Sequence, residues 1–422
     1  MHSVTNAIPT GTIASIPAKA HAHRALICAA LASSPSTILL SRTSKDIDAT
    51  MDSLRGLGAH VVYENKVVTV TPGPAPAKGN VVPHESGTTL RLLLPVAASI
   101  CNDVDVDAKG RLPDRPLEPM LGEMKAHGVT FSQDKPPFTM TGRLQGGNFS
   151  MVGDVSSQFF SGLLLAAPQI GLSTITSTTP LQSSDYVTLT TETMRDFGVE
   201  VEHTLPDRNI NEAFTVPFGT SFIGRDNYQI EGDWSNTAIW MVAAGMTGKP
   251  ITITGMNKNS VQADRRIMQV MIDAGCDVVW NGMNVTVTGR ASKPIHADLE
   301  QMPDMLPVMA ALACSISGES SFVKGARLRL KESDRLVAVA NLVRDLGGTV
   351  REEGDDLYII GSGILKGGHG DCVNDHRLVM AGTLMALISE NPVTLQDSEA
   401  ITKSYPHFFE DWNLLGGNAQ PV

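Results

Sequence analysis

The sequence lacks an apolar run long enough for a transmembrane helix: its longest runs, such as 159–168, are broken well before the roughly 18 residues that such a helix needs. Its first residues also lack the basic and then apolar stretch of a signal peptide. Positive charge is not in excess, since 33 lysines and arginines face 44 acidic residues, and the net charge of -11 disfavours binding to nucleic acid through overall charge. We therefore expect a cytoplasmic protein that engages neither a membrane nor a nucleic acid.

Cys-x-x-Cys pairs and glycine-rich nucleotide loops are absent as well. The cysteines are odd in number and far apart, which disfavours a disulfide scaffold and a zinc ribbon and favours buried free thiols in a reducing compartment. They are Cys28, Cys101, Cys276, Cys314 and Cys372. Neither G-x-x-x-x-G-K-[ST] nor G-x-G-x-x-G occurs, so a nucleotide is not the expected ligand.

An internal repeat is the main feature that is present. The 422 residues, 42% of them hydrophobic, suffice for two large domains. A helix-like stretch that ends at a glycine, followed by a short strand-like run, occurs six times. The intervals are 70, 70, 77, 72 and 69 residues, and the last copy is degraded. The glycines of the six copies are Gly58, Gly128, Gly198, Gly275, Gly347 and Gly416. Each copy predicts a helix that ends on a left-handed glycine. Six such units fit two domains of three α/β units each; the alternative is chance, because the pattern is common in α/β proteins.

The midpoint of the repeat indicates where the domains divide. Residues 205–230 are polar and follow the third copy, so we expect an irregular segment and a domain boundary there. Two three-unit domains that face each other would form a cleft, the usual place for a small-molecule site.

Motifs in the first half place cations and small polar residues at expected helix starts. Lys19 and Arg24 bracket the start of an apolar helix over 25–31, which suggests an anion site or a solvated basic patch. Gly87, between Ser86 and Thr88, precedes an apolar helix over 92–100 and lets backbone N–H groups approach an oxyanion, although Ser/Thr capping explains the same pattern. Arg115 is stiffened by the following proline and suits a carboxylate or phosphate. The series Ser156, Ser157 and Gln158 offers neutral donors to a phosphate, or an N-cap.

Motifs in the second half follow the same scheme. Asp304 precedes a long apolar helix and is either a dipole-compensating acid or a general base. Lys331, Glu332 and Arg335 form either an anion site or a salt-bridged helix start, and Arg377 and Lys403 stand close to further helix starts. Cations at helix starts in an acidic chain predict one focused anion site. They are Lys19, Arg24, Arg115, Lys331, Arg335, Arg377 and Lys403.

The ordered series of these motifs, together with Ser183, resembles that of the 5-enolpyruvylshikimate-3-phosphate synthase family from about residue 10 to the C-terminus. The resemblance implies an inside-out α/β barrel fold with two domains, each of three βαβαββ units about a pseudo-threefold axis. It implies a domain over 17–229, a second over 1–16 plus 230–422, and an active site in the cleft between them. We expect a monomer that needs no cofactor and no metal.

The resemblance also implies an activity and residue roles. The activity is transfer of the enolpyruvyl group of phosphoenolpyruvate to the 5-hydroxyl of shikimate 3-phosphate, with release of phosphate, a step in aromatic amino-acid biosynthesis. Asp304 would accept the hydroxyl proton, and Glu332 and Lys19 are the candidates for proton delivery. Phosphoenolpyruvate would contact Lys19, Gly87, Arg115, Gln158, Arg335, Arg377 and Lys403. Shikimate 3-phosphate would contact Lys19, Arg24, Ser156, Ser157, Gln158, Ser183, Asp304 and Lys331. Gly87 further predicts that glyphosate competes with phosphoenolpyruvate.

Two positions depart from the family pattern, and both concern the acceptor. Ala20 replaces a serine, which removes a hydrogen bond worth about 1.5–3 kcal/mol to a charged ligand, and Ser184 and Asp185 replace a lysine and a proline. They leave two alternatives open. One alternative is a paralogue that does not catalyse the reaction or that uses a different acceptor. The other is the sister enzyme that transfers the enolpyruvyl group to UDP-N-acetylglucosamine. That enzyme family has a cysteine in the loop before the Arg-Pro pair, and the corresponding loop before Arg115 has none.

Overall fold

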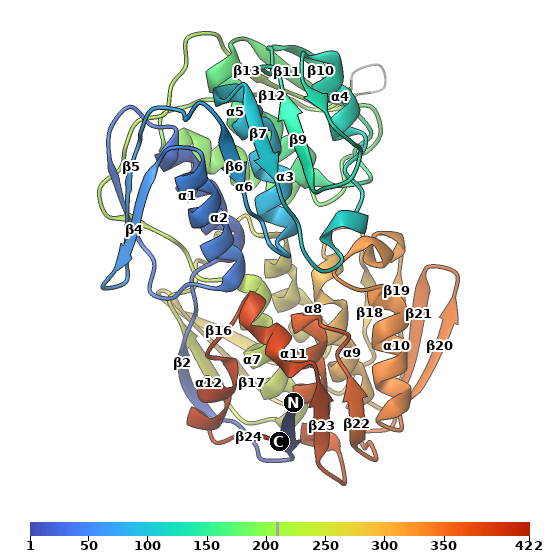
Figure 1. The fold of residues 1–422 in the computed structure, drawn as a ribbon. Coiled ribbons are helices and arrows are strands. Elements are labelled where there is room, and N and C mark those ends of the chain that lie inside the picture. Colours follow the sequence, from blue (N-terminus) through green and yellow to red (C-terminus); the bar gives the residue numbers. More distant parts are fainter. Residues whose placement is uncertain (208–210) are drawn as a thin grey trace. The chain divides into compact units, whose positions relative to one another are not determined.

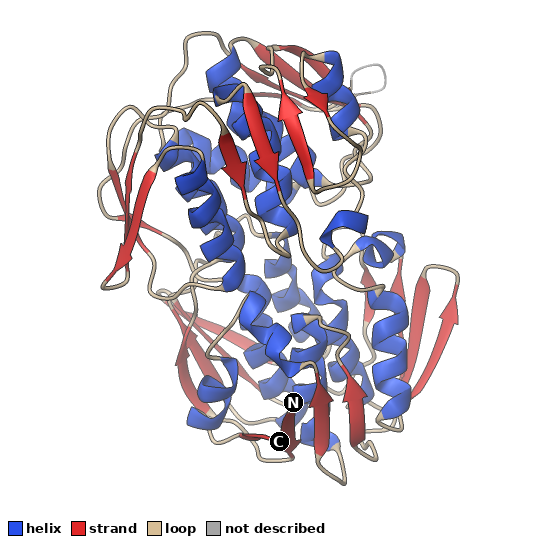
Figure 2. Cartoon of the chain, in the orientation of Figure 1, coloured by secondary structure: helices blue, strands red, loops and turns tan. Residues whose placement is uncertain are grey.

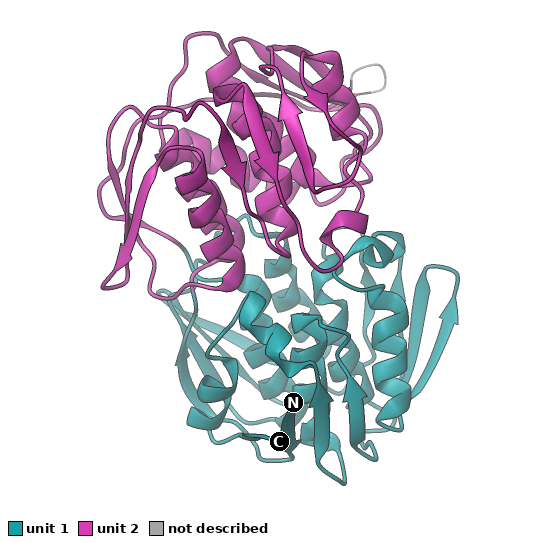
Figure 3. Ribbon diagram, in the orientation of Figure 1, with its two compact units in different colours: residues 1–16, 231–422 teal, residues 17–230 magenta. Residues whose placement is uncertain are grey.

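The computed structural model describes residues 1–207 and 211–422, which form two compact units (Figure 3). One unit is residues 17–230, and the other is residues 1–16 together with 231–422. The boundary thus lies one residue later than the expected one. The expectation that 205–230 is irregular is wrong for two of its parts, since strands Ala213–Val216 and Tyr228–Gln229 lie there. Residues 208–210 of this segment lie outside the described residues.

Each unit carries three four-stranded sheets with one topology (Figure 1). In every sheet the first two strands are parallel and the other two pairings are antiparallel. In the 17–230 unit the sheet orders are β14 (Tyr228–Gln229), β3 (Ser36–Leu39), β5 (Val67–Thr71), β4 (His60–Glu64); β6 (Gly79–Val81), β7 (Asp103–Val106), β9 (Phe138–Thr141), β8 (Thr130–Phe131); and β10 (Gly147–Met151), β11 (Ser173–Ser177), β13 (Ala213–Val216), β12 (Glu202–Thr204).

The other unit repeats this topology with strands from both ends of the chain. Its sheet orders are β2 (Gly11–Ala14), β15 (Ile251–Thr254), β17 (Asn284–Thr288), β16 (Asp277–Asn281); β18 (His296–Asp298), β19 (Gly318–Val323), β21 (Asp356–Gly361), β20 (Thr349–Glu353); and β22 (Gly368–Asp371), β23 (Val393–Gln396), β1 (His2–Thr5), β24 (Asn418–Pro421). The N-terminal strands β1 and β2 complete two of these sheets, and β14 completes a sheet that began with β3. The chain therefore passes between the units twice.

The six repeated glycines behave as predicted. Each follows a helix and precedes a strand, and each has a φ between +86° and +103°, a region that side chains other than hydrogen disfavour. The helices are α2 (Lys45–Gly56), α4 (Met120–Ala126), α6 (Asp185–Asp196), α8 (Ile267–Asp273), α10 (Arg335–Asp345) and α12 (Phe408–Leu414). Each glycine precedes an end strand of a different one of the six sheets, so the repeat in the sequence coincides with the repeat in the fold.

Helices that are buried on nearly all sides form the core of each unit, and the sheets pack outside them (Figure 2). In α9 (Leu306–Cys314) all nine residues are buried, and in α7 (Trp234–Thr247) twelve of fourteen are. The remaining core helices are α1 (Lys19–Ala30), α3 (Gly87–Ile100), α5 (Ser157–Ile170) and α11 (His376–Met385). Strand β21 shows the complementary pattern, because Leu357 and Ile359 are buried and their neighbours Tyr358 and Ile360 are not.

Two predictions from composition can be checked against the fold. All five cysteines are free and buried, as expected. Within the described part of the chain, no helix is both long enough and apolar enough to cross a membrane.

Candidate functional site

Lys19 is the first residue of α1, and its ammonium pairs with the carboxylate of Asp46 at 2.6 Å. Asp46 lies in the first turn of α2, where a negative charge also offsets the helix dipole. The backbone carbonyl of Asp46 accepts a bond from Thr89 of α3 at 3.3 Å. Lys19 is thus held at a point where the starts of three helices meet.

The prediction that Lys19 and Arg24 bracket a helix start is wrong for Arg24. Because α1 begins at Lys19 and not near residue 25, Arg24 lies in the second turn, 1% exposed. Its guanidinium donates to the Thr190 hydroxyl at 2.7 Å and to the carbonyl oxygens of Ala20 at 2.7 Å and Tyr186 at 3.0 Å. Burial lowers the pKa of Arg24 to about 10, so it remains charged at neutral pH. The solvated-patch alternative fails here, since this cation is buried and fully charged.

Gly87 and Arg115 are in close contact. Gly87 is the first residue of α3, and a Cβ added to it would lie 2.6 Å from the Arg115 guanidinium. Ser86 caps the same helix by accepting a bond from the Thr89 N–H at 3.2 Å, which bears out the capping alternative for this motif. The missing side chain of Gly87 is therefore what lets Arg115 reach the start of α3.

Gln158 lies beside the same helix start. Its amide nitrogen donates to the Thr88 hydroxyl at 2.9 Å, and its oxygen accepts from Arg91 at 3.2 Å. The Ser156 hydroxyl caps α5 by accepting from the Gln158 N–H at 3.3 Å, which is the bond that the N-cap interpretation expects. Ser157, at the first position of α5, is buried.

Ser183 is buried and has a left-handed backbone, with φ of +53°. Its carbonyl accepts from the Tyr186 N–H at 3.1 Å, and the Tyr186 carbonyl in turn accepts from Arg24. Ser183 is thus linked to Arg24 through one residue. We call Lys19, Asp46, Gly87, Arg115 and Gln158 the Lys19 cluster.

The second group of candidates centres on Arg335, the first residue of α10. Its guanidinium pairs with Asp304 at 2.6 Å, with Glu332 at 2.7 Å and with Asp375 at 2.8 Å. Lys331 pairs with the same Asp304 oxygen at 3.0 Å. The salt bridges that this motif was expected to form are therefore present, and the acids between the cations offset their charge.

Arg377 and Lys403 join this group through Asp375 and its neighbour. The Asp375 carboxylate caps α11 by accepting from the Arg377 N–H at 3.0 Å, and Lys403 donates to the Asn374 carbonyl at 2.7 Å. The Arg377 guanidinium donates to the Ser235 carbonyl at 2.7 Å. We call Asp304, Lys331, Glu332, Arg335 and Arg377 the Asp304 cluster.

Burial and charge pairing together shift the pKa values of this cluster in opposite directions. Burial alone would raise the pKa of Asp304, but Lys331, Arg335 and Arg377 outweigh it and hold that pKa well below the usual range of a carboxyl group. Burial lowers the pKa of Lys331, with help from Arg327 and Arg335. Burial also opposes the charge of Arg335, but Asp375, Glu332 and Asp304 raise its pKa. The cluster can therefore hold an ionised carboxylate beside an ammonium that gives up its proton more readily than usual.

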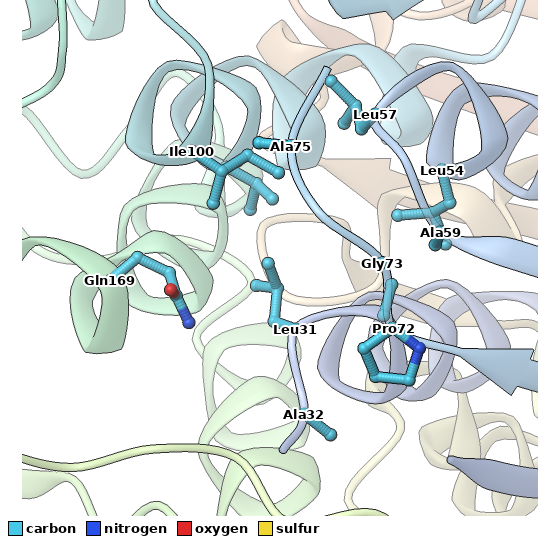
Figure 4. Close-up of a pocket in the computed structure, with 12 residues that line it drawn as sticks. Leu31, Ala32, Leu54, Leu57, Ala59, Pro72, Gly73, Ala75, Ile100 and Gln169 are labelled. Carbon is cyan, nitrogen blue, oxygen red and sulfur yellow. The ribbon is translucent and has the colours of Figure 1, made fainter. Parts of the chain in front are cut away.

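A cavity of about 150 Å³ in the 17–230 unit contains none of the predicted site residues (Figure 4). It is lined mainly by aliphatic side chains such as Leu31, Leu54, Leu57 and Ile100, with Gln169 as a polar group. These residues lie near the C-terminal ends of α1, α2, α3 and α5, whereas the Lys19 cluster uses their N-terminal turns. The predicted site residues are thus separate from this cavity.

Sequence reasoning missed several residues that belong to these clusters or interact with them. Asp46 is an ordinary first-turn acid in the sequence, so only the fold reveals its pairing with Lys19. Arg91 had a signal, because it is a cation inside an otherwise apolar helix. Ser235 and Asp264 gave none, because the serine follows a tryptophan at a helix start and the acid precedes two arginines.

The seven predicted cations thus divide into three in the 17–230 unit and four in the other. A fold of six repeated α/β units with paired cations and acids at helix starts is typical of an enzyme for small anionic substrates. The profile of the EPSP synthase (3-phosphoshikimate 1-carboxyvinyltransferase) family matches residues 7–412. The chain belongs to this family.

Individual relatives agree with this assignment. The chain is 36% identical to a 3-phosphoshikimate 1-carboxyvinyltransferase of Clostridium kluyveri over 406 residues, covering 95% of this chain and 94% of the relative. It is 34% identical to one of Methanocorpusculum labreanum over 417 residues, covering 97% of each. The solved structure of EPSP synthase from Acinetobacter baumannii superposes with a TM-score of 0.80 at 22% identity, over 100% of this chain and 99% of that one, and confirms the inside-out α/β fold.

Proposed function

We propose that this chain transfers the carboxyvinyl group of phosphoenolpyruvate to the 5-hydroxyl of shikimate 3-phosphate and releases phosphate. The observation that carries the proposal is Asp304, an ionised carboxylate fixed between Lys331 and Arg335 in a protein of this family. The relatives that bear the name of this activity support it, since they match 95% and 97% of the chain. They do not favour the sister enzyme or a paralogue without turnover.

In this proposal the reaction is an addition followed by an elimination. The acceptor oxygen bonds to C2 of phosphoenolpyruvate while its proton leaves and another proton reaches the C3 methylene. Phosphate then departs from C2 and C3 loses a proton, so the double bond is restored. Asp304 accepts the hydroxyl proton. Either Glu332 or Lys19 delivers one proton to C3 and takes a proton back from C3 in the elimination.

The low pKa of Asp304 makes it a weak base while Lys331 and Arg335 neutralise it. Anionic substrates that draw these two cations away would raise the pKa of Asp304. The carboxylate then becomes a better base at the moment when the hydroxyl is in place. The binding energy of the substrates thereby serves the proton transfer.

The two clusters divide the recognition of phosphoenolpyruvate. Its carboxylate and phosphate would be held by cations that can form paired, charge-assisted hydrogen bonds. These are Arg115, Arg335, Arg377 and Lys403, assisted by Lys19, Gln158 and the space at Gly87. Lys403 donates to the Asn374 carbonyl, and Arg377 donates to the Ser235 carbonyl. Within the described residues the Nε of Arg377 has no hydrogen-bond partner, so this arginine has a further donor for an anion.

Shikimate 3-phosphate would use mainly the 17–230 unit. Its phosphate would contact Ser156, Ser157 and Ser183, and Arg24 with Lys331 would contact its carboxylate and hydroxyls, while Lys19, Gln158 and Asp304 complete the set. Ala20 has no hydroxyl for this purpose, and its carbonyl supports Arg24. We therefore expect weaker acceptor binding than a serine at this position would give, by about one to two decades.

The experiment is phosphate release by the purified protein with phosphoenolpyruvate and each acceptor in turn. We expect release with shikimate 3-phosphate and none with UDP-N-acetylglucosamine or without acceptor. Absence of release at saturating concentrations of both substrates would contradict the proposal. Release with UDP-N-acetylglucosamine alone would support the sister activity.

We further propose that the protein works as a monomer in the cytoplasm and needs no metal or other cofactor. Light scattering on the active preparation should give the mass of one chain. A larger mass that persists on dilution would contradict the monomer, and loss of activity in the presence of a chelator would contradict the lack of a metal.

A further inference from the structure

Ser235 connects Arg377 to a buried acid that lies outside the predicted site. Its carbonyl accepts from the Arg377 guanidinium at 2.7 Å, and its hydroxyl donates to the Asp264 carboxylate. Ser235 is in the first turn of α7, and Asp264 is in the short helix Ala263–Arg266, so neither is adjacent to Arg377 in sequence. Ser235 thus contacts Arg377 through its backbone and Asp264 through its side chain.

Arg377 has an incomplete set of partners. It is 4% exposed, and within the described residues its Nε has no hydrogen-bond partner. A buried donor without a partner usually marks strain, an ordered water or a ligand site. Here it lies on a cation that the proposed function assigns to phosphoenolpyruvate, so an anionic ligand would complete its bonding.

Asp264 is 1% exposed and faces charged groups on three other elements. They are Asp304 in the short helix Pro303–Met305, Arg377 on α11 and Asp233 at the start of α7. Burial and the negative charges of Asp304 and Asp233 raise the pKa of Asp264 to about 6, although Arg377 and the Ser235 hydroxyl oppose this. Asp264 and Asp304 therefore differ in charge state near pH 6, since Asp304 stays ionised.

We propose that Asp264 is a positioning residue, which holds Arg377 through Ser235 and, by its own charge state, sets how strongly Arg377 attracts the anionic substrate. The proposal rests on the proposed function, which places phosphoenolpyruvate at Arg377. Protonated Asp264 leaves the charge of Arg377 available to the ligand. Ionised Asp264 competes with the ligand for that charge.

The direction of the pH effect follows from linkage. An anion bound at Arg377 favours the protonated form of Asp264, so binding takes up a proton. The affinity for the anion should therefore fall as the pH rises through about 6. Because one proton is involved, the fall is at most about tenfold per pH unit.

The test compares the wild-type protein with Asp264→Asn, which keeps the size and the polar character of the side chain but cannot ionise. We would measure KM for phosphoenolpyruvate and kcat from about pH 5 to about pH 8. The phosphate of phosphoenolpyruvate titrates in the same range, but identically for both proteins, so the ratio of the two KM values isolates Asp264. We expect this ratio to change about threefold to tenfold across the range, with KM of the variant less dependent on pH and kcat little changed.

Sulfate provides a second readout that does not depend on turnover, because its charge is constant over this range. Its dissociation constant, measured by calorimetry, should rise with pH for the wild type and stay level for Asp264→Asn. Asp273→Asn is the matched control, since Asp273 is an exposed acid nearby in the sequence, on α8. This variant should follow the wild type at every pH.

Several outcomes overturn the proposal. Parallel pH profiles for the wild type and Asp264→Asn would show that the charge of Asp264 does not reach the ligand. An equal loss of affinity at every pH would show a purely structural role. If Asp264→Asn does not fold, Ser235→Ala keeps the carbonyl and removes the hydroxyl, and an unchanged pH profile in that variant would contradict the link through Ser235. A wild-type protein that releases no phosphate but shows the expected sulfate profile would contradict the proposed function and leave the role of Asp264 intact.

Discussion

Arg335 illustrates how single residues of this protein combine structure with chemistry. It is almost fully buried, yet it is bonded to three carboxylates, of which Asp375 is fully buried and Asp304 and Glu332 are partly accessible. A buried cation with satisfied partners is tolerated, whereas removing one partner leaves unpaired charge. A substrate can therefore reach and replace the ion pairs that Arg335 forms with Asp304 and Glu332, whereas its ion pair with Asp375 stays buried.

The first prediction concerns Asp304. Asp304→Asn should reduce kcat about 10²-fold to 10⁴-fold, because the general base is lost while the shape is kept. Shikimate 3-phosphate should still bind, since Lys331 and Arg335 are then less neutralised. Steady-state kinetics and calorimetry measure the two effects.

Asp298→Asn is the control for this change, because Asp298 is an exposed acid of β18 paired with the surface residue Lys324. It should leave kcat unchanged. Near-normal turnover of Asp304→Asn would remove Asp304 from the role of base.

The second prediction concerns Gly87. A Cβ at this position lies 2.6 Å from the Arg115 guanidinium, so in Gly87→Ala the arginine must shift away from the start of α3. We expect KM for phosphoenolpyruvate to rise about tenfold, or about 1.4 kcal/mol, and inhibition by glyphosate to weaken at least as much. Inhibition assays on both proteins measure this.

The control for Gly87→Ala is Gly122→Ala, which adds the same methyl group at an exposed position of helix α4, against the side chain of Glu118. Its kinetics should match the wild type. If Gly87→Ala binds phosphoenolpyruvate and glyphosate normally, the contact with Arg115 has no part in recognition. An absence of glyphosate inhibition at millimolar concentrations in the wild type would contradict the expectation taken from Gly87.

At the scale of the element, the repeated helix–glycine–strand turn is the unit from which the fold is built. Gly58 shows why glycine is required: its φ is +103°, and an added Cβ would lie 2.3 Å from the Pro74 carbonyl oxygen. Both the backbone angle of Gly58 and the close approach of the segment around Pro74 disfavour a side chain at this position. The repeat in the sequence therefore has a direct steric cause.

The third prediction separates these two causes. Gly58→Ala should lower the free energy of unfolding by about 2–4 kcal/mol, of which the backbone angle accounts for about 1–2 kcal/mol. Gly219→Ala has a similar positive φ of +81° with no atom within 4 Å of the added Cβ, so it should show the backbone cost alone. Urea denaturation measures both. Equal losses in the two variants would show that the contact with Pro74 relaxes freely.

The starts of the elements were predicted less well than their existence. Helices expected over 25–31 and 92–100 begin at Lys19 and Gly87, six and five residues earlier. The apolar pattern that signals a helix begins only after the first turn or two, where small and polar residues meet the neighbouring helix starts. The predicted site residues Lys19, Arg24 and Gly87 lie in these first turns. The late helix start therefore led us to expect Arg24 at the start of a helix, whereas it lies inside one.

At the scale of the whole molecule, both ends of the chain contribute to one unit. Strand β1 lies between β23 and β24, so two segments separated by almost the whole chain share a sheet. Val4 of this strand is fully buried, and Ser3 beside it faces the opposite side. The stability of the 231–422 residues therefore depends on the first few residues.

The fourth prediction tests this dependence. Val4→Asp buries an unpaired charge and should cost about 3 kcal/mol or more, whereas Ser3→Asp should cost less than about 1 kcal/mol. Hydrogen exchange should show lost protection in β22, β23 and β24, with residues 17–230 affected less. Equal loss of protection in the two units would contradict the assignment of β1 to one of them.

The sequence by itself determined the six repeated units, the glycines that end their helices, the order of the motifs and hence the family, because each of these is written in local composition and spacing. The tertiary structure alone decided which strand completes which sheet and which acid meets which cation. Lys19 with Asp46, Arg335 with Asp375 and Ser235 with Asp264 are pairs from separate elements. Such pairs depend on how helices pack after the chain has folded, and ionic partners many residues apart leave no periodic signal in the sequence.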